Sequence, residues 1–163
     1  MTRLRNNTRN ARGTRQTGFT LIETLVAMVV LAVGMLGIAA LYIEGLRSSQ
    51  ASVSRTVAVN LAADMADRIR ANPNAPAGSY AGAGPGANNL CVNGAGPCLP
   101  GQLAQDDWFW WGQDVQNRLP QGAAAQIVEN VAAVAPATQF DIVLSWPEPG
   151  QQVPATYTMR FSF

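Results

Sequence analysis

The sequence predicts an α+β fold in which one long N-terminal helix packs on a small antiparallel β-sheet, with a short second helix. Three observations predict it. No proline occurs between Phe19 and Asn72, and the apolar residues of that stretch follow a helical spacing. Two C-terminal segments, FDIVLSW and ATYTMRFSF, alternate between apolar and polar residues, as strands do. The helical pattern LAQDDWFWWGQDVQNRLP lies between the long helix and these strands.

The first 18 residues are strongly basic. All eleven basic residues of the chain are arginines, and five of them precede Gly18, where there is no acid. The remaining residues carry six arginines against ten acids, a net charge of −4. A basic cluster that ends where an apolar segment begins is typical of orientation at a membrane and not of nucleic-acid binding.

The apolar segment that follows is long enough to cross a membrane. From Thr24 to Ile43 there are twenty residues without a charge, which as a helix span about 30 Å. The preceding arginines place the N-terminus in the cytoplasm and the residues after Glu44 across the membrane. A secretory signal peptide would carry a small residue behind its apolar region, whereas Gly18 lies in front of it.

Glu23 lies at the start of this apolar segment and needs a partner. Charged residues at a helix centre in a membrane cost about 2.5 to 3.5 kcal/mol on insertion scales. Cleavage between Gly18 and Phe19 would create a positively charged amine on Phe19. That amine could pair with Glu23 four residues on in the same helix, or with Glu23 of a neighbouring, axially staggered helix. The alternative is an incidental glutamate at the membrane interface.

The second half of the predicted helix, which runs from about residue 19 to 71, has one apolar stripe. Its members recur at spacings of four or seven and are Leu46, Val53, Val57, Leu61, Met65 and Ile69. Asp64 with Arg68 and Asp67 with Arg70 lie at helical spacing, and we interpret them as solvated pairs, with a partner contact as the alternative. Asn72-Pro73 ends the helix.

Residues 73 to 101 are rich in glycine and proline, which predicts a long surface loop. Cys91 and Cys98 enclose CVNGAGPC, and a disulfide is the simplest interpretation on the oxidising side of a membrane. A metal site lacks ligands, because the chain has no histidine and no further cysteine. The stretch GAGPGANN has neither the Lys-Ser/Thr nor the flanking strand and helix of a phosphate-binding loop.

The aromatic run WFWW belongs to the predicted short helix. Trp108, Trp111 and Val115 share a face and should point to the core, leaving Phe109 or Trp110 partly exposed. A stacking platform for a ligand is the weaker alternative.

The two alternating segments should pair as antiparallel strands, and their apolar faces should cover the helix stripe. They comprise Phe140, Ile142, Leu144 and Trp146 in the first, and Ala155, Tyr157, Met159, Phe161 and Phe163 in the second. AQIVENVAAV is a weaker third strand. No nucleophile with its base, metal cluster or cofactor site can be assembled from these residues, so an enzyme is not expected.

The stretch TGFTLIETLVAMVVLAVGMLGIAAL resembles the leader-cleavage and N-terminal helix region of type IV prepilins and pseudopilins. RSSQASVSRTVAVNLAADMADRIRANPNA is similar to the helix continuation of minor pilins of the PilV kind, and DDWFWWGQDVQNRLPQG is more loosely similar to them. The resemblance implies a pilin-like lollipop fold, cleavage by prepilin peptidase after Gly18, N-methylation of Phe19 and a role for Glu23 in subunit pairing. Major pilins often carry a proline in the membrane half of the helix, where this chain has Ala40.

These inferences divide the chain into a cleaved basic leader (1–18), a transmembrane and assembly half-helix (19–45) and a periplasmic head (46–163). The expected function is that of a minor pilin that primes or supports type IV pilus assembly. Its expected partners are other minor pilins, the major pilin, prepilin peptidase and the inner membrane, with a tip adhesin as a further candidate. A minor pseudopilin of a type II secretion system is the main alternative. The second alternative is a membrane-anchored periplasmic binding module that uses Trp110.

Overall fold

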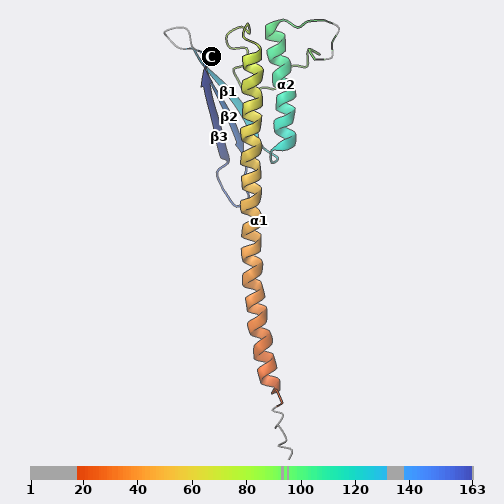
Figure 1. The fold of residues 1–163 in the computed structure, drawn as a ribbon, viewed down its shortest axis with the longest axis vertical. Helices are drawn as coiled ribbons and strands as arrows, with labels where there is room; N and C mark the ends of the chain where they lie inside the picture. The colour runs from red at the N-terminus through yellow and green to blue at the C-terminus, as the bar shows by residue number, and fades with distance from the viewer. Residues whose placement is uncertain (1–17, 93, 95, 132–137, 163) are drawn as a thin grey trace, which may run out of the picture. The chain divides into compact units, whose positions relative to one another are not determined.

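The computed structural model describes residues 18–92, 94, 96–131 and 138–162 (Figure 1). Two helices, α1 (Leu21–Ala71) and α2 (Pro100–Arg118), precede three strands, β1 (Ala124–Val131), β2 (Thr138–Trp146) and β3 (Ala155–Ser162). The chain divides into two compact units at Ile43 and Glu44. The α+β fold is confirmed, and α1 ends at the residue expected from Asn72-Pro73.

The three strands form one antiparallel sheet with β2 in the centre. Ile127 of β1 pairs with Ile142 of β2, and Ile142 pairs with Met159 of β3. Side chains of β2 alternate between buried and half-buried from Phe140 to Trp146, as the sequence pattern predicts. The weak third strand is confirmed as β1; the end of its sequence pattern, residues 132 to 134, lies outside the described residues.

The hydrophobic core lies in the second unit, where α1, α2 and the sheet meet. The prediction that the apolar stripe of α1 is covered was wrong for its first two residues, because Leu46 is 49% exposed and Val53 is 61% exposed. Three alanines take part instead, and the buried residues of α1 are Ala58, Leu61, Ala62, Met65, Ala66 and Ile69. Small side chains let neighbouring elements approach closely, so a stripe read only from large residues misses these positions.

Helix α2 begins at Pro100, three residues before the expected pattern, because proline is favoured in a first helical turn. The side chain of Gln102 accepts a hydrogen bond from the backbone N–H of Leu99 at 3.0 Å. Asp106 and Asp107 therefore lie beyond the first turn, and both are buried.

The tryptophans of α2 take the places expected of them. Trp108 and Trp111 are buried with their rings edge to face at 5.2 Å, whereas Trp110 is 41% exposed. The indole of Trp108 donates to the carbonyl of Tyr80 and that of Trp111 to the carbonyl of Leu61, each at 2.8 Å. This α2 face joins the loop after α1 to α1 itself.

The long loop between the helices was expected at the surface, but part of it is buried. Tyr80 is among the fully buried side chains. Gly82 makes a bridge with Ile127, its N–H donating to the Ile127 carbonyl at 2.9 Å and its carbonyl accepting from Ile127 at 2.8 Å. The loop therefore covers part of the outer edge of β1.

The apolar side chains of β3 share one face as predicted, but they are only half-buried. Those from Ala155 to Phe161 pack against the margin of the core. Phe163 lies outside the described residues. Strand β3 is therefore a less completely covered element than β2.

Candidate assembly site

The N-terminal end of α1 is capped by Thr20. The backbone N–H of Glu23 donates to the Thr20 carbonyl at 3.1 Å and makes a longer bond of 3.4 Å to its hydroxyl oxygen. Glu23 thus lies in the first helical turn, where the helix dipole favours a negative charge. The spacing of threonine and glutamate in Thr-Leu-Ile-Glu is a known start signal for helices, and it would have placed the helix start from sequence.

Phe19 lies before the helix and is 82% exposed. Residues four apart meet on one face only where both are helical, so helical spacing by itself does not bring Phe19 to Glu23. Gly18 is also exposed, and no atom lies within 4 Å of where a Cβ would be. The Gly18–Phe19 bond is therefore in an open, non-helical stretch of backbone. The leader residues 1 to 17 lie outside the described residues.

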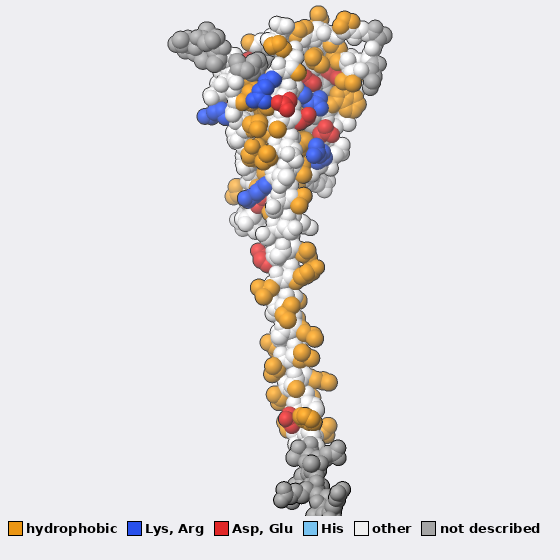
Figure 2. Space-filling view, viewed as in Figure 1, with side chains coloured by type: hydrophobic (Ala, Val, Ile, Leu, Met, Phe, Trp, Pro, Cys, Tyr) orange, Lys and Arg blue, Asp and Glu red, His pale blue; other side chains and the backbone are white. Residues whose placement is uncertain are grey.

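The first half of α1 is exposed over its whole circumference. Every residue from Gly18 to Gln50 is exposed, and apolar side chains line the helix (Figure 2). By length and composition α1 can cross a membrane: its most apolar stretch of 18 residues has a mean hydropathy of 2.6, and none of that stretch is buried. A helix that is apolar all round needs lipid or other helices to cover it. Gly34 and Gly37 lie inside α1 without interrupting it.

The other end of α1 carries a polar network, and here one expectation was wrong. Arg68 binds Asp64 at 2.9 Å as predicted, but it also binds Asp107 of α2 at 3.3 Å and is only partly exposed. The Tyr80 hydroxyl donates to Asp107 at 2.7 Å and accepts from the Asn72 side chain at 3.1 Å. The pair is therefore not merely solvated: it joins both helices to the loop.

Two physical effects act on the ionisable groups of this network. Burial, followed by the hydrogen bond to Asp107, raises the pKa of the Tyr80 hydroxyl. Burial opposes the charged form of Arg68, but its bonds to Asp64 and Asp107 outweigh that effect and raise its pKa. Both groups therefore keep their protons at neutral pH, as the network requires.

The second predicted ion pair behaves differently. Arg70 binds Asp67 at 3.0 Å, and both side chains are largely exposed. The guanidinium of Arg70 also lies 4.7 Å from the centre of the Phe161 ring. This contact links one flank of α1 to β3.

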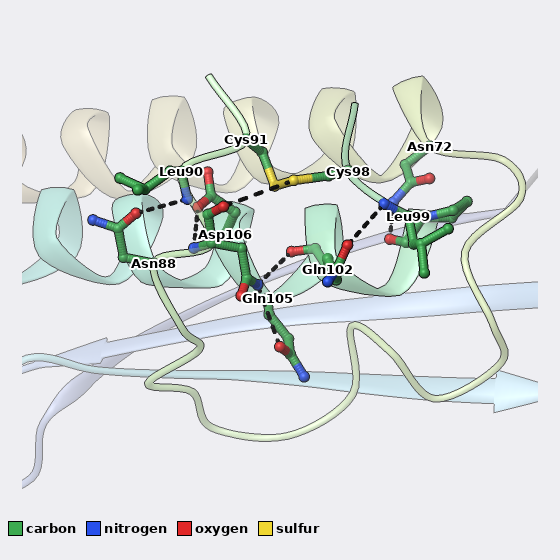
Figure 3. Close-up of a disulfide and its surroundings, with 11 residues drawn as sticks. Asn72, Asn88, Leu90, Cys91, Cys98, Leu99, Gln102, Gln105 and Asp106 are labelled. Carbon is green, nitrogen blue, oxygen red and sulfur yellow. Dashed lines mark hydrogen bonds between the residues drawn. A yellow bond between two sulfur atoms is a disulfide. The ribbon is translucent and has the colours of Figure 1, made fainter. Parts of the chain in front are cut away.

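Cys91 and Cys98 form a disulfide beside α2 (Figure 3). The loop around it is held by that helix: the backbone N–H of Asn89 donates to the buried side chain of Asp106 at 2.7 Å, and the side-chain amide of Asn89 donates to the backbone carbonyl of Gln102 at 2.9 Å. Leu90 adopts a φ of 55°, which is uncommon for a residue other than glycine. Asp106 thus has a structural role that its position in the sequence did not reveal.

The glycine-rich stretch GAGPGANN lies against α2. A Cβ at Gly86 would come within 2.6 Å of the Phe109 backbone nitrogen and of the Trp108 Cβ, and the φ of Gly86 is +72°. The N–H of Ala87 donates to the Gln105 carbonyl at 3.0 Å. Gly86 therefore serves close backbone packing. Over the described ranges, no group of three or more histidine, cysteine or acidic residues could hold a metal ion.

The comparisons with known proteins bear on both units. A family model described as the prokaryotic N-terminal methylation motif matches residues 13–39. A second model, described as type IV pilin Tt1218, matches residues 40–109. No curated protein and no solved structure gave a match. The two models adjoin, and together they run from the leader through the exposed half of α1 and the polar network into α2.

Proposed function

Because this chain belongs to the type IV pilins, which are structural, non-enzymatic proteins that assemble with other pilins, we propose that it is a minor pilin that primes or supports pilus assembly. The observation that carries the proposal is a single acid, Glu23, in the first turn of a helix whose following twenty residues are uncharged and exposed.

The proposed mechanism is a change of charge at one end of α1. Prepilin peptidase cuts after Gly18, and the new amine of Phe19 is N-methylated and stays positively charged. Since Phe19 precedes the helix, its amine pairs with Glu23 of a neighbouring, staggered subunit. In a low-dielectric environment an unpaired charge is costly and a pair is strong, so cleavage converts a membrane-resident precursor into a subunit able to assemble.

Two features support a minor rather than a major role. Helix α1 is continuous from Leu21 to Ala71 and has Ala40 where major pilins often carry proline. The segment LAADMADRIRANP, which resembles minor pilins, contributes Asp64, Arg68 and Asn72 to the polar network at the end of α1. Proline is a common cause of a break in a helix, so with Ala40 at this point α1 lacks the residue that favours local melting in major pilins.

The proposed location is the inner membrane, with the N-terminus in the cytoplasm and the head in the periplasm, followed by the pilus fibre or its tip. The Cys91–Cys98 disulfide supports a periplasmic head, because disulfides persist in oxidising compartments. Prepilin peptidase, other minor pilins and the major pilin are the proposed partners, with a tip adhesin as a further candidate.

The test is deletion of the gene in the source bacterium, followed by complementation with wild type, Glu23→Gln or Glu44→Gln. Glu44 is the matched control, because it is an exposed acid of the same helix. We expect deletion to reduce pilus number and twitching motility, and wild type and Glu44→Gln to restore them, whereas Glu23→Gln should not.

The second readout is the intact mass of the protein from sheared fibres. A mass that corresponds to residues 19–163 plus one methyl group supports cleavage, methylation and incorporation together. Unchanged pili and motility after deletion would contradict the proposal. Loss of exported enzymes with intact pili would assign the chain to a type II secretion pseudopilus instead.

A further inference from the structure

The two edges of the sheet differ in how far other parts of the chain cover them. The outer edge of β1 is partly covered by the two backbone hydrogen bonds between Gly82 and Ile127. Among the described residues, β3 pairs only with β2, and no backbone hydrogen bond joins residues 155 to 160 to any other element. The chain's own loop therefore closes part of the β1 edge, whereas the β3 edge is open over residues 155 to 160 of the described chain.

The sequence of β3 does nothing to block pairing at this edge. Natural edge strands are commonly protected by lysine, proline, a bulge or a very short length. Strand β3 runs for eight residues without any of these devices. Its one charged residue, Arg160, is held by Asp141 of β2 through bonds of 2.6 and 2.8 Å. That charge is tied to the neighbouring strand and does not guard the free edge.

The flank of α1 beside β3 is left uncovered. Arg55 binds Glu148, in the turn before β3, at 3.2 Å, and Arg70 lies over the ring of Phe161 in β3. Val59 and Ala63 fall between these arginines at helical spacing, so they face the same side. Val59 is 40% exposed and Ala63 is half-buried.

The apolar side chains of β3 are incompletely covered in the same way. The corresponding side chains of β2 are buried, whereas Tyr157 and Met159 are only half-buried. One more strand would lie about 4.8 Å beyond β3 and would present every second side chain to this side of the sheet. Apolar residues at those positions would cover Val59, Ala63 and the open face of β3 together.

We propose that the outer edge of β3 and the Val59–Ala63 flank of α1 form a docking site for one extended strand of a neighbouring, non-identical pilin. The strand hydrogen-bonds to the β3 backbone and places apolar residues at alternate positions against α1, a recognition mode in which backbone bonds give affinity and alternate side chains give specificity. This inference rests on the proposed assembly role, because that role supplies the partner.

A second copy of this chain fits the edge poorly. If two β3 strands paired in parallel about a two-fold axis, one sheet would be turned over and Thr156, Thr158 and Arg160 of the copy would face the apolar flank. If they paired antiparallel, the two α1 helices would run in opposite directions, unlike helices of subunits inserted side by side in one membrane. A strand from a different subunit avoids both conflicts.

The first test is site-specific photocrosslinking of the full chain in the source bacterium. A photoreactive residue replaces Thr158, which is exposed on β3, or Val128, which is exposed on β1 beside the closed edge. We expect position 158 to crosslink to another pilin and position 128 not to. Crosslinks to a second copy of this chain, or equal crosslinking at the two positions, would overturn the proposal.

The second test compares Val59→Lys with Val128→Lys. The two valines have similar exposure, 40% and 37%, so the isolated subunit should tolerate a lysine at either position. A lysine at 59 would be buried unpaired beneath the added strand, and we expect at least about a tenfold loss of co-purified partner pilin from detergent-solubilised membranes. Val128→Lys should have no effect.

The outcomes distinguish this inference from the proposed function. If Val59→Lys entered fibres and retained its partner pilin as well as Val128→Lys does, the docking site would be refuted while the minor-pilin role stood. If wild-type protein were absent from fibres but still crosslinked through position 158 to another pilin in membranes, the docking site would stand and the role in the pilus would fail.

Discussion

Replacing Tyr80 by phenylalanine tests the polar network that joins both helices to the loop. The substitution removes a hydroxyl that donates to Asp107 at 2.7 Å and accepts from Asn72 at 3.1 Å. Asn72 keeps its bond to the Pro100 carbonyl at 2.8 Å, and Asp107 keeps Arg68 at 3.3 Å. The loss is therefore mainly one hydrogen bond to a buried charged acceptor.

A hydrogen bond to a charged group contributes about 1.5 to 3 kcal/mol, and phenylalanine leaves almost no cavity. We expect Tyr80→Phe to lower the free energy of unfolding of the head by about 2 kcal/mol. The measurement is urea denaturation of the full chain in detergent, followed by tryptophan fluorescence, which reports on the buried indoles of α2.

The matched control is Tyr157→Phe, because Tyr157 is half-buried in β3 and its hydroxyl has no hydrogen-bond partner in the described part of the chain. It should change the unfolding free energy by less than about 0.5 kcal/mol. Equal losses for the two variants would refute the reasoning, since burial of the ring and not the Asp107 bond would then carry the effect.

Three further predictions use the same unfolding measurement. Because the pKa of Tyr80 is raised in the folded state, the unfolded chain loses this proton first above about pH 10. The free energy of unfolding should therefore fall as pH rises through that range, and it should fall less in Tyr80→Phe. Identical pH profiles of the two proteins would contradict this prediction. Removing the disulfide with Cys91→Ser and Cys98→Ser should cost about 2 kcal/mol, because the closed loop is short, with a sequence separation of seven; reduction of the wild type should reproduce this loss. Gly86→Ala should be far more damaging than Gly150→Ala, because both glycines have positive φ but only at Gly86 would a Cβ meet backbone, at 2.6 Å; equal losses would show that φ strain alone matters.

The elements with a periodic sequence were predictable. Helix α1 could be followed to its last residue because nothing interrupts its pattern before Asn72-Pro73, and the strands could be found because apolar residues alternate in them. The start of α1 was misplaced by two residues because the Thr20 cap was overlooked. Leu46 and Val53 were wrongly expected in the core because a stripe shows which face is apolar but not how far other elements extend along it.

The loop contacts could not be predicted, since a segment rich in glycine and proline has no period that assigns a partner to each residue. Tyr80 offers no sequence signal that it reaches Asp107. The candidate assembly site was easier to identify, because a lone glutamate in a long apolar segment is costly to bury without a partner and therefore stands out. What the sequence missed there was the non-helical position of Phe19.

The order of elements along the chain has a consequence for synthesis. Chains emerge from the N-terminus first, so α1 is complete while its buried face, with Leu61, Met65 and Ile69, still lacks every element that will cover it. Helix α2 arrives next and brings Trp111 to the Leu61 carbonyl. The β1–β2 and β2–β3 hairpins then form between neighbours in sequence, which is a fast step because the contacts are local. The whole of α1 is therefore synthesised before any element of the head that covers it.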